Sequence, residues 1–368
     1  MPVSSRKWWG LAIGAVVVAF LLYRSRGLLN LSQFSGARLY EVVRGANYLY
    51  LFLAVVTIYA CYAVRALRWQ KFQSHVGSAG LWNIYAMNLA GFSALFLLGR
   101  AAEPVRPLLI SRKEKIPIAA TFGIYALERI LDAACTAVLA AIGLLVFESS
   151  GHPGGQGVGP GLEKGIRTAG MVPTVFAILA ISGLVYLRLH GSAVLERRME
   201  GWLAEHERGW RAPVARIVLG FARGVQTVRT WGDLFAAVVL SFFHWVLVVV
   251  CYYLVMKSFG GQLGALSFTD AMVVLVFTMV GSALQLPGVG GGAQALSLFA
   301  FTHLYGIEQE AALAAAIVLW LVTFAACTLV GVPLLFKEGV SLGELRRMRV
   351  EEAEELDAEM IEHPAKPL

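Results

Sequence analysis

The stretch "LQLPGVGGGAQAL", residues 284–296, decides how the C-terminal part of this chain must fold. It holds one proline, four glycines and two glutamines, and it interrupts a long run of apolar residues. Proline removes a backbone donor and glycine loses the most entropy on ordering, so a regular helix does not continue through it. At membrane depth, irregular backbone is tolerated only where protein or a water-filled cavity lines it. The stretch therefore predicts a turn enclosed by protein.

The composition around this stretch is that of a membrane protein. Of 368 residues, 58% are hydrophobic and only 15% are charged, against about a quarter charged in soluble domains. The apolar residues form blocks, many of them long enough to cross a hydrocarbon core: 8–23, 47–64, 80–98, 117–147, 170–189, 231–255, 268–286, 293–306 and 310–336. We predict an all-α polytopic membrane protein in which the first block is a retained helix and not a cleaved signal peptide.

The four cysteines, Cys61, Cys135, Cys251 and Cys327, all lie within apolar blocks and lack metal-ligand spacing. We expect them to pack as buried apolar side chains. No metal ion or other cofactor is predicted.

Charge between the blocks predicts the orientation. Residues 65–79 carry arginine and lysine without acids, and 188–229 carry eight arginines against four glutamates. The positive-inside rule places these segments and both termini in the cytoplasm, with 148–169 and 256–267 outside, in a prokaryotic plasma (inner) membrane. Residues 24–46 are arginine-rich yet must lie outside, and we interpret "FSGARLYEVVRG" as an interfacial amphipathic stretch. The net charge of +7 is assigned to the cytoplasmic loops, so no nucleic-acid partner is predicted.

Counting the crossings predicts two places where the chain turns back. Segments 80–116 and 268–308 must each return to the side that they entered from. The simplest arrangement has about six full transmembrane helices and two re-entrant helical hairpins from opposite faces, a possible inverted repeat. We expect residues 1–340 to form a single membrane domain and 341–368 a charged cytoplasmic tail.

The first hairpin tip, "GRAAEPVRP", carries charges at a spacing of three. Arg100, Glu103 and Arg106 share one face if the stretch is helical, and Glu103 can then pair with either arginine. Charges at membrane depth are costly and usually mark function. The alternative is that this loop lies in cytoplasmic water.

A second charged group lies within block 117–147, in "YALERILDAACTA". Glu128 and Asp132 are i,i+4 neighbours on one helix face, so they need a cation, a shared proton or water. Arg129 lies about 100° around the helix and has a side chain suited to binding phosphate. A structural ion-pair network that fixes this helix to a hairpin is the alternative.

The glycine-rich turn predicts a half-helix that begins near Gly291. A buried helix N-terminus attracts anions, while a tight hairpin without a ligand is the alternative. The substrate-binding residues expected here are Gln285, Gly288, Gly290, Gly291, Gly292 and Gln294. We expect the two hairpin tips to meet near the midplane and to frame one polar site.

These motifs together resemble the transmembrane domain family of lysylphosphatidylglycerol synthases, also called flippase-like proteins. The resemblance covers about residues 10–345. It rests on "RALRWQ", "MNLAGFSALFLLGRAAEPVRPLLI", "YALERILD" and "LPGVGGGAQALSLFAFTHLYGI". The sequence departs from the family pattern in two ways. We expect no room for the soluble synthase domain. Ala293 and Gln294 follow the glycines, where many relatives are expected to carry an acidic residue.

The resemblance implies transbilayer movement of a phospholipid or polyprenyl-phosphate lipid, through a polar site between the hairpins. On this hypothesis the chain is a transporter and not an enzyme, and it works beside lipid-modifying enzymes. Two alternatives stay open. One is an intramembrane enzyme that acts on a lipid phosphate or glycolipid with Glu128 and Asp132 as acid and base. The other is a non-catalytic scaffold for a lipid-pathway glycosyltransferase.

Overall fold

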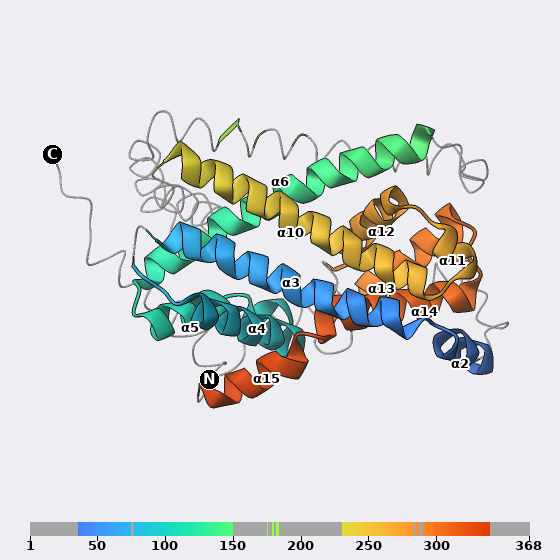
Figure 1. The fold of residues 1–368 in the computed structure, drawn as a ribbon, viewed down its shortest axis with the longest axis horizontal. Helices are drawn as coiled ribbons and strands as arrows, with labels where there is room; N and C mark the ends of the chain where they lie inside the picture. Colours follow the sequence, from blue (N-terminus) through green and yellow to red (C-terminus); the bar gives the residue numbers. More distant parts are fainter. Residues whose placement is uncertain are drawn as a thin grey trace, which may run out of the picture. The chain divides into compact units, whose positions relative to one another are not determined.

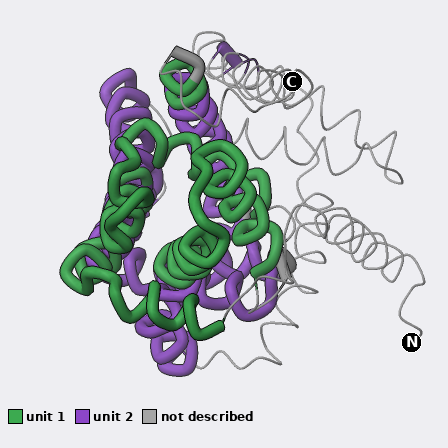
Figure 2. Tube along the Cα trace, turned by 90° about the vertical axis from the view of Figure 1, so that its right-hand side faces the viewer, with its two compact units in different colours: residues 1–55, 143–163, 249–323 green, residues 56–142, 164–248, 324–368 purple. Residues whose placement is uncertain are grey.

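A computed structural model describes residues 36–74, 77–149, 230–282, 285–286 and 290–338, with the isolated positions 175, 179, 182 and 183. The chain divides into two compact units, which Figure 2 shows in different colours. Unit 1 comprises residues 1–55, 143–163 and 249–323, and unit 2 comprises residues 56–142, 164–248 and 324–368. The predicted tail at 341–368 and the blocks at 8–23 and 170–189 lie largely or wholly outside the described residues.

Long apolar helices dominate the described chain, which confirms the all-α polytopic membrane class (Figure 1). Five spans are long and apolar enough to cross a membrane: Tyr48–Gln73, Leu81–Leu98, Ala120–Phe147, Trp231–Ser258 and Gln309–Lys337. The first of these is helix α3, and its 26 residues extend over about 39 Å at 1.5 Å per residue. That length exceeds a hydrocarbon core of about 30 Å.

Three of the helices contribute residues to both units. These are α3 (Tyr48–Gln73), α6 (Ile118–Ser149) and α10 (Trp231–Ser258). Most of their length is apolar, as expected of helices surrounded by lipid and other helices, and charged residues interrupt α3 and α6. They are the framework on which the charged side chains of unit 2 are placed.

Unit 2 contains the first predicted turn. Helix α4 (Leu81–Leu98) is followed by a 3-10 turn, η2 (Gly99–Ala102), and by α5 (Val105–Glu114), which packs back against α4. Pro104 is the N-cap of α5, where the missing N–H costs nothing. Lys115, in the left-handed conformation, ends the helix. The turn-back at 80–116 is therefore present, and its re-entrance from one membrane face stays a prediction.

Close helix packing in unit 2 depends on two glycines. A Cβ at Gly91 of α4 would lie 2.5 Å from the Cβ of Arg106 in α5. A Cβ at Gly331 would lie 2.1 Å from Ser93 Oγ, and Gly331 belongs to α15 (Thr328–Lys337). Since carbon atoms do not approach so closely, only glycine allows α4 to contact both neighbours at this distance.

Unit 1 contains the second predicted turn. Helix α2 (Gly36–Arg44) precedes α3, and the short α11 (Gly261–Ala265) follows α10. Helix α12 (Phe268–Gly281) begins with Ser267 and Asp270 in a reciprocal capping box and leads into the glycine-rich turn. The chain then continues through α13 (Gly292–Phe299), the π-helical η5 (Ala300–Leu304), α14 (Gln309–Trp320) and the π-helical η6 (Leu321–Ala325).

The glycine-rich turn has a feature that the sequence did not predict. Gln285–Leu286 (β1) and Gly290–Gly291 (β2) pair as antiparallel two-residue strands. Gly290 and Gly291 adopt φ values of +86° and +118°, which side-chain-bearing residues rarely reach. A Cβ at Gly281 would lie 2.1 Å from Gly292 O, so α12 and α13 also contact through glycine. The predicted half-helix is confirmed, since α13 begins at Gly292.

Candidate functional site: a buried arginine–carboxylate network

Two arginines of α3 form one side of the network. Arg65 and Arg68 are buried, and Arg68 is only 1% exposed. The apolar block was expected to end at residue 64, with both arginines in the segment after it, but α3 continues to Gln73 and contains them. Their spacing of three residues puts both guanidinium groups on one face. The continuing apolar pattern of Ala66, Trp69 and Phe72, which are all buried, was the signal that could have revealed this.

The two carboxylates of α6 face these arginines. Arg68 donates to Glu128 Oε1 and to Asp132 Oδ1, each at 2.7 Å. Arg65 forms an ion pair with Asp132, and its Nε lies 3.2 Å from Glu128 Oε1. The i,i+4 carboxylates thus share one face, as predicted, and the cation that they require comes from α3.

Arg106 of α5 binds the same carboxylate from the hairpin. It donates to Glu128 Oε1 at 3.1 Å and Oε2 at 2.6 Å, and to Asn88 Oδ1 at 3.2 Å. The two parallel bonds form the bidentate fork that makes arginine–carboxylate pairs strong. An ion pair between α6 and a hairpin, which the structural alternative in the sequence analysis required, is therefore present.

Aromatic rings surround the Arg106 guanidinium. Its Cζ lies 4.8 Å from the ring centroid of Trp69, 5.2 Å from that of Phe92 and 5.1 Å from that of Tyr125. The electron-rich faces of these rings stabilise a cation that has lost its water.

Arg129 turns back onto the carboxylates of its own helix. It donates to Asp132 Oδ2 at 2.9 Å and to Glu128 Oε1 at 3.3 Å. Its side chain is 39% exposed, far more than those of Arg65, Arg68 and Arg106. Its Nε is buried and has no hydrogen-bond partner.

Helix α10 completes the network with neutral groups. Ser241 accepts a hydrogen bond from Arg68 at 2.7 Å, and Trp245 Nε1 donates to Asp132 Oδ1 at 3.2 Å. His244 Nδ1 lies 3.2 Å from the Cys61 carbonyl oxygen. Neither Ser241 nor Trp245 was predicted, because nothing in an isolated apolar helix shows which face meets a charge.

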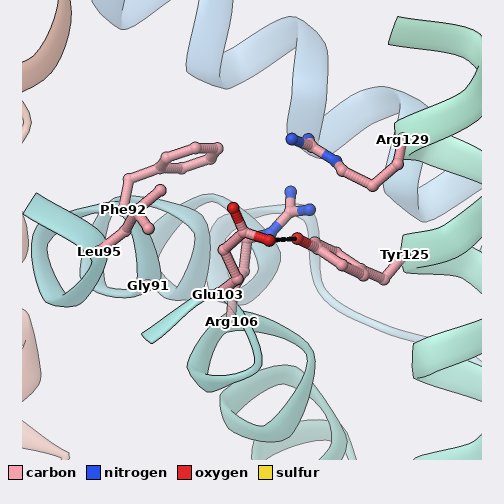
Figure 3. Close-up of a pocket in the computed structure, with 7 residues that line it drawn as sticks. All are labelled: Gly91, Phe92, Leu95, Glu103, Arg106, Tyr125 and Arg129. Atoms are coloured by element: carbon pink, nitrogen blue, oxygen red, sulfur yellow. Dashed lines mark hydrogen bonds between the residues drawn. The ribbon is translucent and has the colours of Figure 1, made fainter. Parts of the chain in front are cut away.

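Figure 3 shows a small pocket at the edge of the network. Its solvent volume is about 20 Å³, which is room for about one water molecule. Phe92 and Leu95 of α4 line one side, and Tyr125 and Arg129 of α6 line the other. The Tyr125 hydroxyl donates to Glu103 Oε2 at 3.1 Å. The remaining lining residues are Gly91 and Arg106.

The network carries more positive than negative charge. Within the described residues, four guanidinium groups converge on two carboxylates, which leaves a surplus of two positive charges. If Glu103, which lines the pocket, is counted as well, the surplus is one positive charge. Three buried donors of the network, Arg65 Nε, Asn88 Nδ2 and Arg129 Nε, have no hydrogen-bond partner. Buried donors are normally satisfied, so the arrangement is suited to receiving an anion.

The first hairpin tip differs from its predicted form. Arg100 lies in the 3-10 turn η2, so it does not share a continuous helix with Arg106 in α5. The common helical face expected for Arg100, Glu103 and Arg106 is therefore wrong, because η2 and Pro104 change the helical phase. The side chain of Arg100 lies outside the described residues.

In unit 1, Gln294 satisfies part of the opened backbone. Its Oε1 accepts a hydrogen bond from the Gly291 N–H at 2.6 Å. A Cβ at Gly290 would lie 2.2 Å from Gln294 Nε2, so the glutamine fills the space inside the turn. Gly288 and the side chain of Gln285 lie outside the described residues. The meeting of this turn with the first hairpin stays a prediction, because the two belong to different units.

The four cysteines are buried and form no disulfide, which confirms their expected packing role.

Comparison with known proteins places the chain in a family. A family model described as the lysylphosphatidylglycerol synthase TM region matches residues 7–331. A UPF0104 membrane protein from Methanothermobacter thermautotrophicus is 22% identical over 320 residues, which cover 83% of this chain and 90% of that protein. The extent of the family match confirms the resemblance inferred from the motifs, and the chain belongs to the lysylphosphatidylglycerol synthase transmembrane-region family.

Proposed function

We propose that this protein moves a lipid with a phosphate-bearing anionic headgroup across the bilayer. The family is lipid-related, and the chain is a multi-pass membrane protein. The observation that carries the proposal is the surplus of guanidinium groups in the buried network of unit 2. Uncompensated charge in an apolar region is costly, and a lipid phosphate would compensate it.

Arg129 and Arg106 are the groups that would meet the phosphate. Both line the pocket, and Arg129 combines an exposed side chain with an unpartnered Nε donor. A guanidinium group is suited to binding phosphate, and Arg106, whose fork binds Glu128, would contribute its charge. Arg65 and Arg68 lie deeper and hold Glu128 and Asp132 in place.

The pocket must widen for a headgroup to enter. Its volume of about 20 Å³ is room for about one water molecule, since one water requires about 10–15 Å³. A phosphate group is larger than one water molecule. We therefore assign the structure to a closed state of the transport cycle. In the open state, the headgroup would cross a polar path while its acyl chains stay in the bilayer.

The same geometry favours transport over intramembrane catalysis. Glu128 accepts from Arg68 and Arg106, and Asp132 accepts from Arg68, Arg129 and Trp245. Carboxylates that accept several charged donors are poor proton donors near neutral pH. This pairing argues against the acid–base hypothesis. The scaffold hypothesis does not depend on the geometry of the network, so the pairing does not test it.

The test is lipid scrambling in liposomes that contain the purified full chain and fluorescent phosphatidylglycerol. Arg129→Gln removes one pocket guanidinium and keeps a polar side chain. We expect its scrambling rate to fall about tenfold or more, because a charge-assisted hydrogen bond is lost. The control is Arg112→Gln, which removes an exposed arginine of α5. Equal rates for wild type and Arg129→Gln would overturn the proposal.

A further inference from the structure

One of the protein's own anions lines the pocket at the edge of the network. Glu103 lines it together with Arg106 and Arg129. In Figure 3 the Glu103 carboxylate points into the space between Tyr125 and these guanidinium groups. The Tyr125 hydroxyl holds it with a hydrogen bond of 3.1 Å. A carboxylate therefore lies where the proposed function requires a phosphate.

Carboxylate and phosphodiester are chemically exchangeable at such a position. Both carry a single negative charge, and both offer two oxygens that match the guanidinium fork. Replacing one with the other keeps the net charge of the residues and ligand at the pocket unchanged. An empty pocket would not have this property.

Glu103 lies outside the helices that carry the buried network. It lies in the turn between η2 and α5, outside both helices. Gly99, at the start of this turn, has a φ of +72°, a region that glycine enters freely. Glu128 and Asp132, in contrast, project from the middle of the 32-residue helix α6.

We propose, on the basis of the proposed function, that Glu103 is an internal counter-anion that the phosphate of the lipid headgroup displaces. Its carboxylate competes with the phosphate for Arg106 and Arg129 and sets the affinity of the site. Its return expels the phosphate and completes the transport cycle. Glu103 is thus a specificity-determining residue that sets the balance between binding and release of the lipid phosphate.

Glu103→Gln separates this role from a structural one. The amide keeps the shape and can accept the Tyr125 hydrogen bond, but it no longer competes for the guanidinium groups. The full chain is placed in nanodiscs of phosphatidylcholine, and binding of fluorescent phosphatidylglycerol is titrated. We expect the Kd of Glu103→Gln to be about tenfold lower than that of wild type, with slower scrambling in liposomes. A residue needed only for folding would raise the Kd or lower the yield of folded protein, and would not lower the Kd.

The matched control is Glu338→Gln. This carboxylate pairs with the exposed Lys113 at 2.8 Å, so its loss should leave the Kd unchanged. If Glu103→Gln does not purify as a folded protein, Tyr125→Phe is the second variant, because it releases the Glu103 carboxylate and keeps the ring. We expect its Kd to change a few-fold in the same direction. A Kd that is unchanged or raised in the purified variant overturns the inference.

Two further measurements distinguish a failure of this inference from a failure of the proposed function. Glycerol 3-phosphate is titrated as a soluble phosphate. A gain in affinity only for glycerol 3-phosphate would support Glu103 as the counter-anion and would count against a lipid ligand. A gain for phosphatidylglycerol without any scrambling by wild type would support the inference and overturn transport. Scrambling by wild type with an unchanged Kd in Glu103→Gln would overturn the inference alone.

Discussion

Glu128 joins three helices through its two carboxylate oxygens. It is 1% exposed and accepts hydrogen bonds from Arg68 of α3 and Arg106 of α5. A buried ion pair is not in itself strongly stabilising, because both charges must leave water. Breaking one is nonetheless costly, since the remaining charges stay buried without compensation.

Substitution of Glu128 should therefore destabilise the protein strongly. We expect Glu128→Gln to lower the free energy of unfolding by about 3–5 kcal/mol, because Arg68 and Arg106 lose their shared acceptor. Thermal unfolding of the full chain in detergent, followed by circular dichroism, measures the change. Glu338→Gln is the matched control and should change stability by less than about 1 kcal/mol, since its partner is exposed. Equal stability losses in the two variants would contradict the assigned role of the network.

At the same scale, the sequence pointed to Arg106 and to the charged group of α6, but not to Arg65 and Arg68. Glu128, Arg129 and Asp132 stand out because they interrupt an apolar block. Arg65 and Arg68 follow an apolar block and resemble the arginines that flank transmembrane helices. Two carboxylates at i,i+4 required a cation, but which arginine supplies it depends on the packing of α3 against α6, and a linear pattern does not specify that.

At the scale of elements, the α4–α5 hairpin is set by Gly91. Its Cα faces the Cα and Cβ of Arg106, where an added Cβ would lie 2.8 and 2.5 Å away. The glycine therefore fixes the position of Arg106 over Glu128 as well as the distance between the two helices. Nothing in "NLAGFSA" alone distinguishes this glycine from others in membrane helices, where small residues at helix contacts are common.

Gly91→Ala should displace α5 from α4. We expect a loss of about 1–3 kcal/mol in stability from overpacking and weaker phosphatidylglycerol binding, because Arg106 moves with its helix. Thermal unfolding and the nanodisc titration measure the two effects. The control is Gly232→Ala in α10, where an added Cβ meets only Thr230 Oγ1 at 3.6 Å. Since alanine is the better helix former, this control should be neutral or slightly stabilising. Wild-type binding by Gly91→Ala would contradict the close-packing account.

The glycine-rich turn shows how far a local pattern extends. Its position and the start of α13 follow from proline and glycine chemistry, which acts over a few residues. The strand pairing at Gln285–Leu286 and Gly290–Gly291 depends on how α12 and α13 contact through Gly281 and Gly292. That contact joins residues eleven positions apart, so no short window of sequence contains it.

At the scale of the whole molecule, the orientation in the membrane remains a prediction from the charge distribution. The positive-inside rule places residues 65–79 in the cytoplasm and 256–267 outside. The described parts of both segments contain exposed positions, Ser78 and Gln262. These positions offer a direct test.

Single cysteines at these two positions should label from opposite sides. In spheroplasts, a membrane-impermeant maleimide should modify Gln262→Cys and leave Ser78→Cys unmodified until the membrane is opened. The four native cysteines are buried, so the wild-type chain should label only after denaturation. Labelling of Ser78→Cys in sealed spheroplasts would reverse the assigned topology.

The sequence by itself determined the membrane class, the helix breaks within segments 80–116 and 268–308, and the presence of a charged group on α6. These follow from block length, helix-breaking residues and charge, which are properties of neighbouring positions. The tertiary structure decided that Arg65, Arg68 and Arg106 converge on Glu128 and Asp132, and that Glu103 lies in the pocket beside Arg129. These contacts join residues up to 67 positions apart. They depend on helix packing distances that glycines at distant positions set, and a pattern along one chain does not encode which faces will meet.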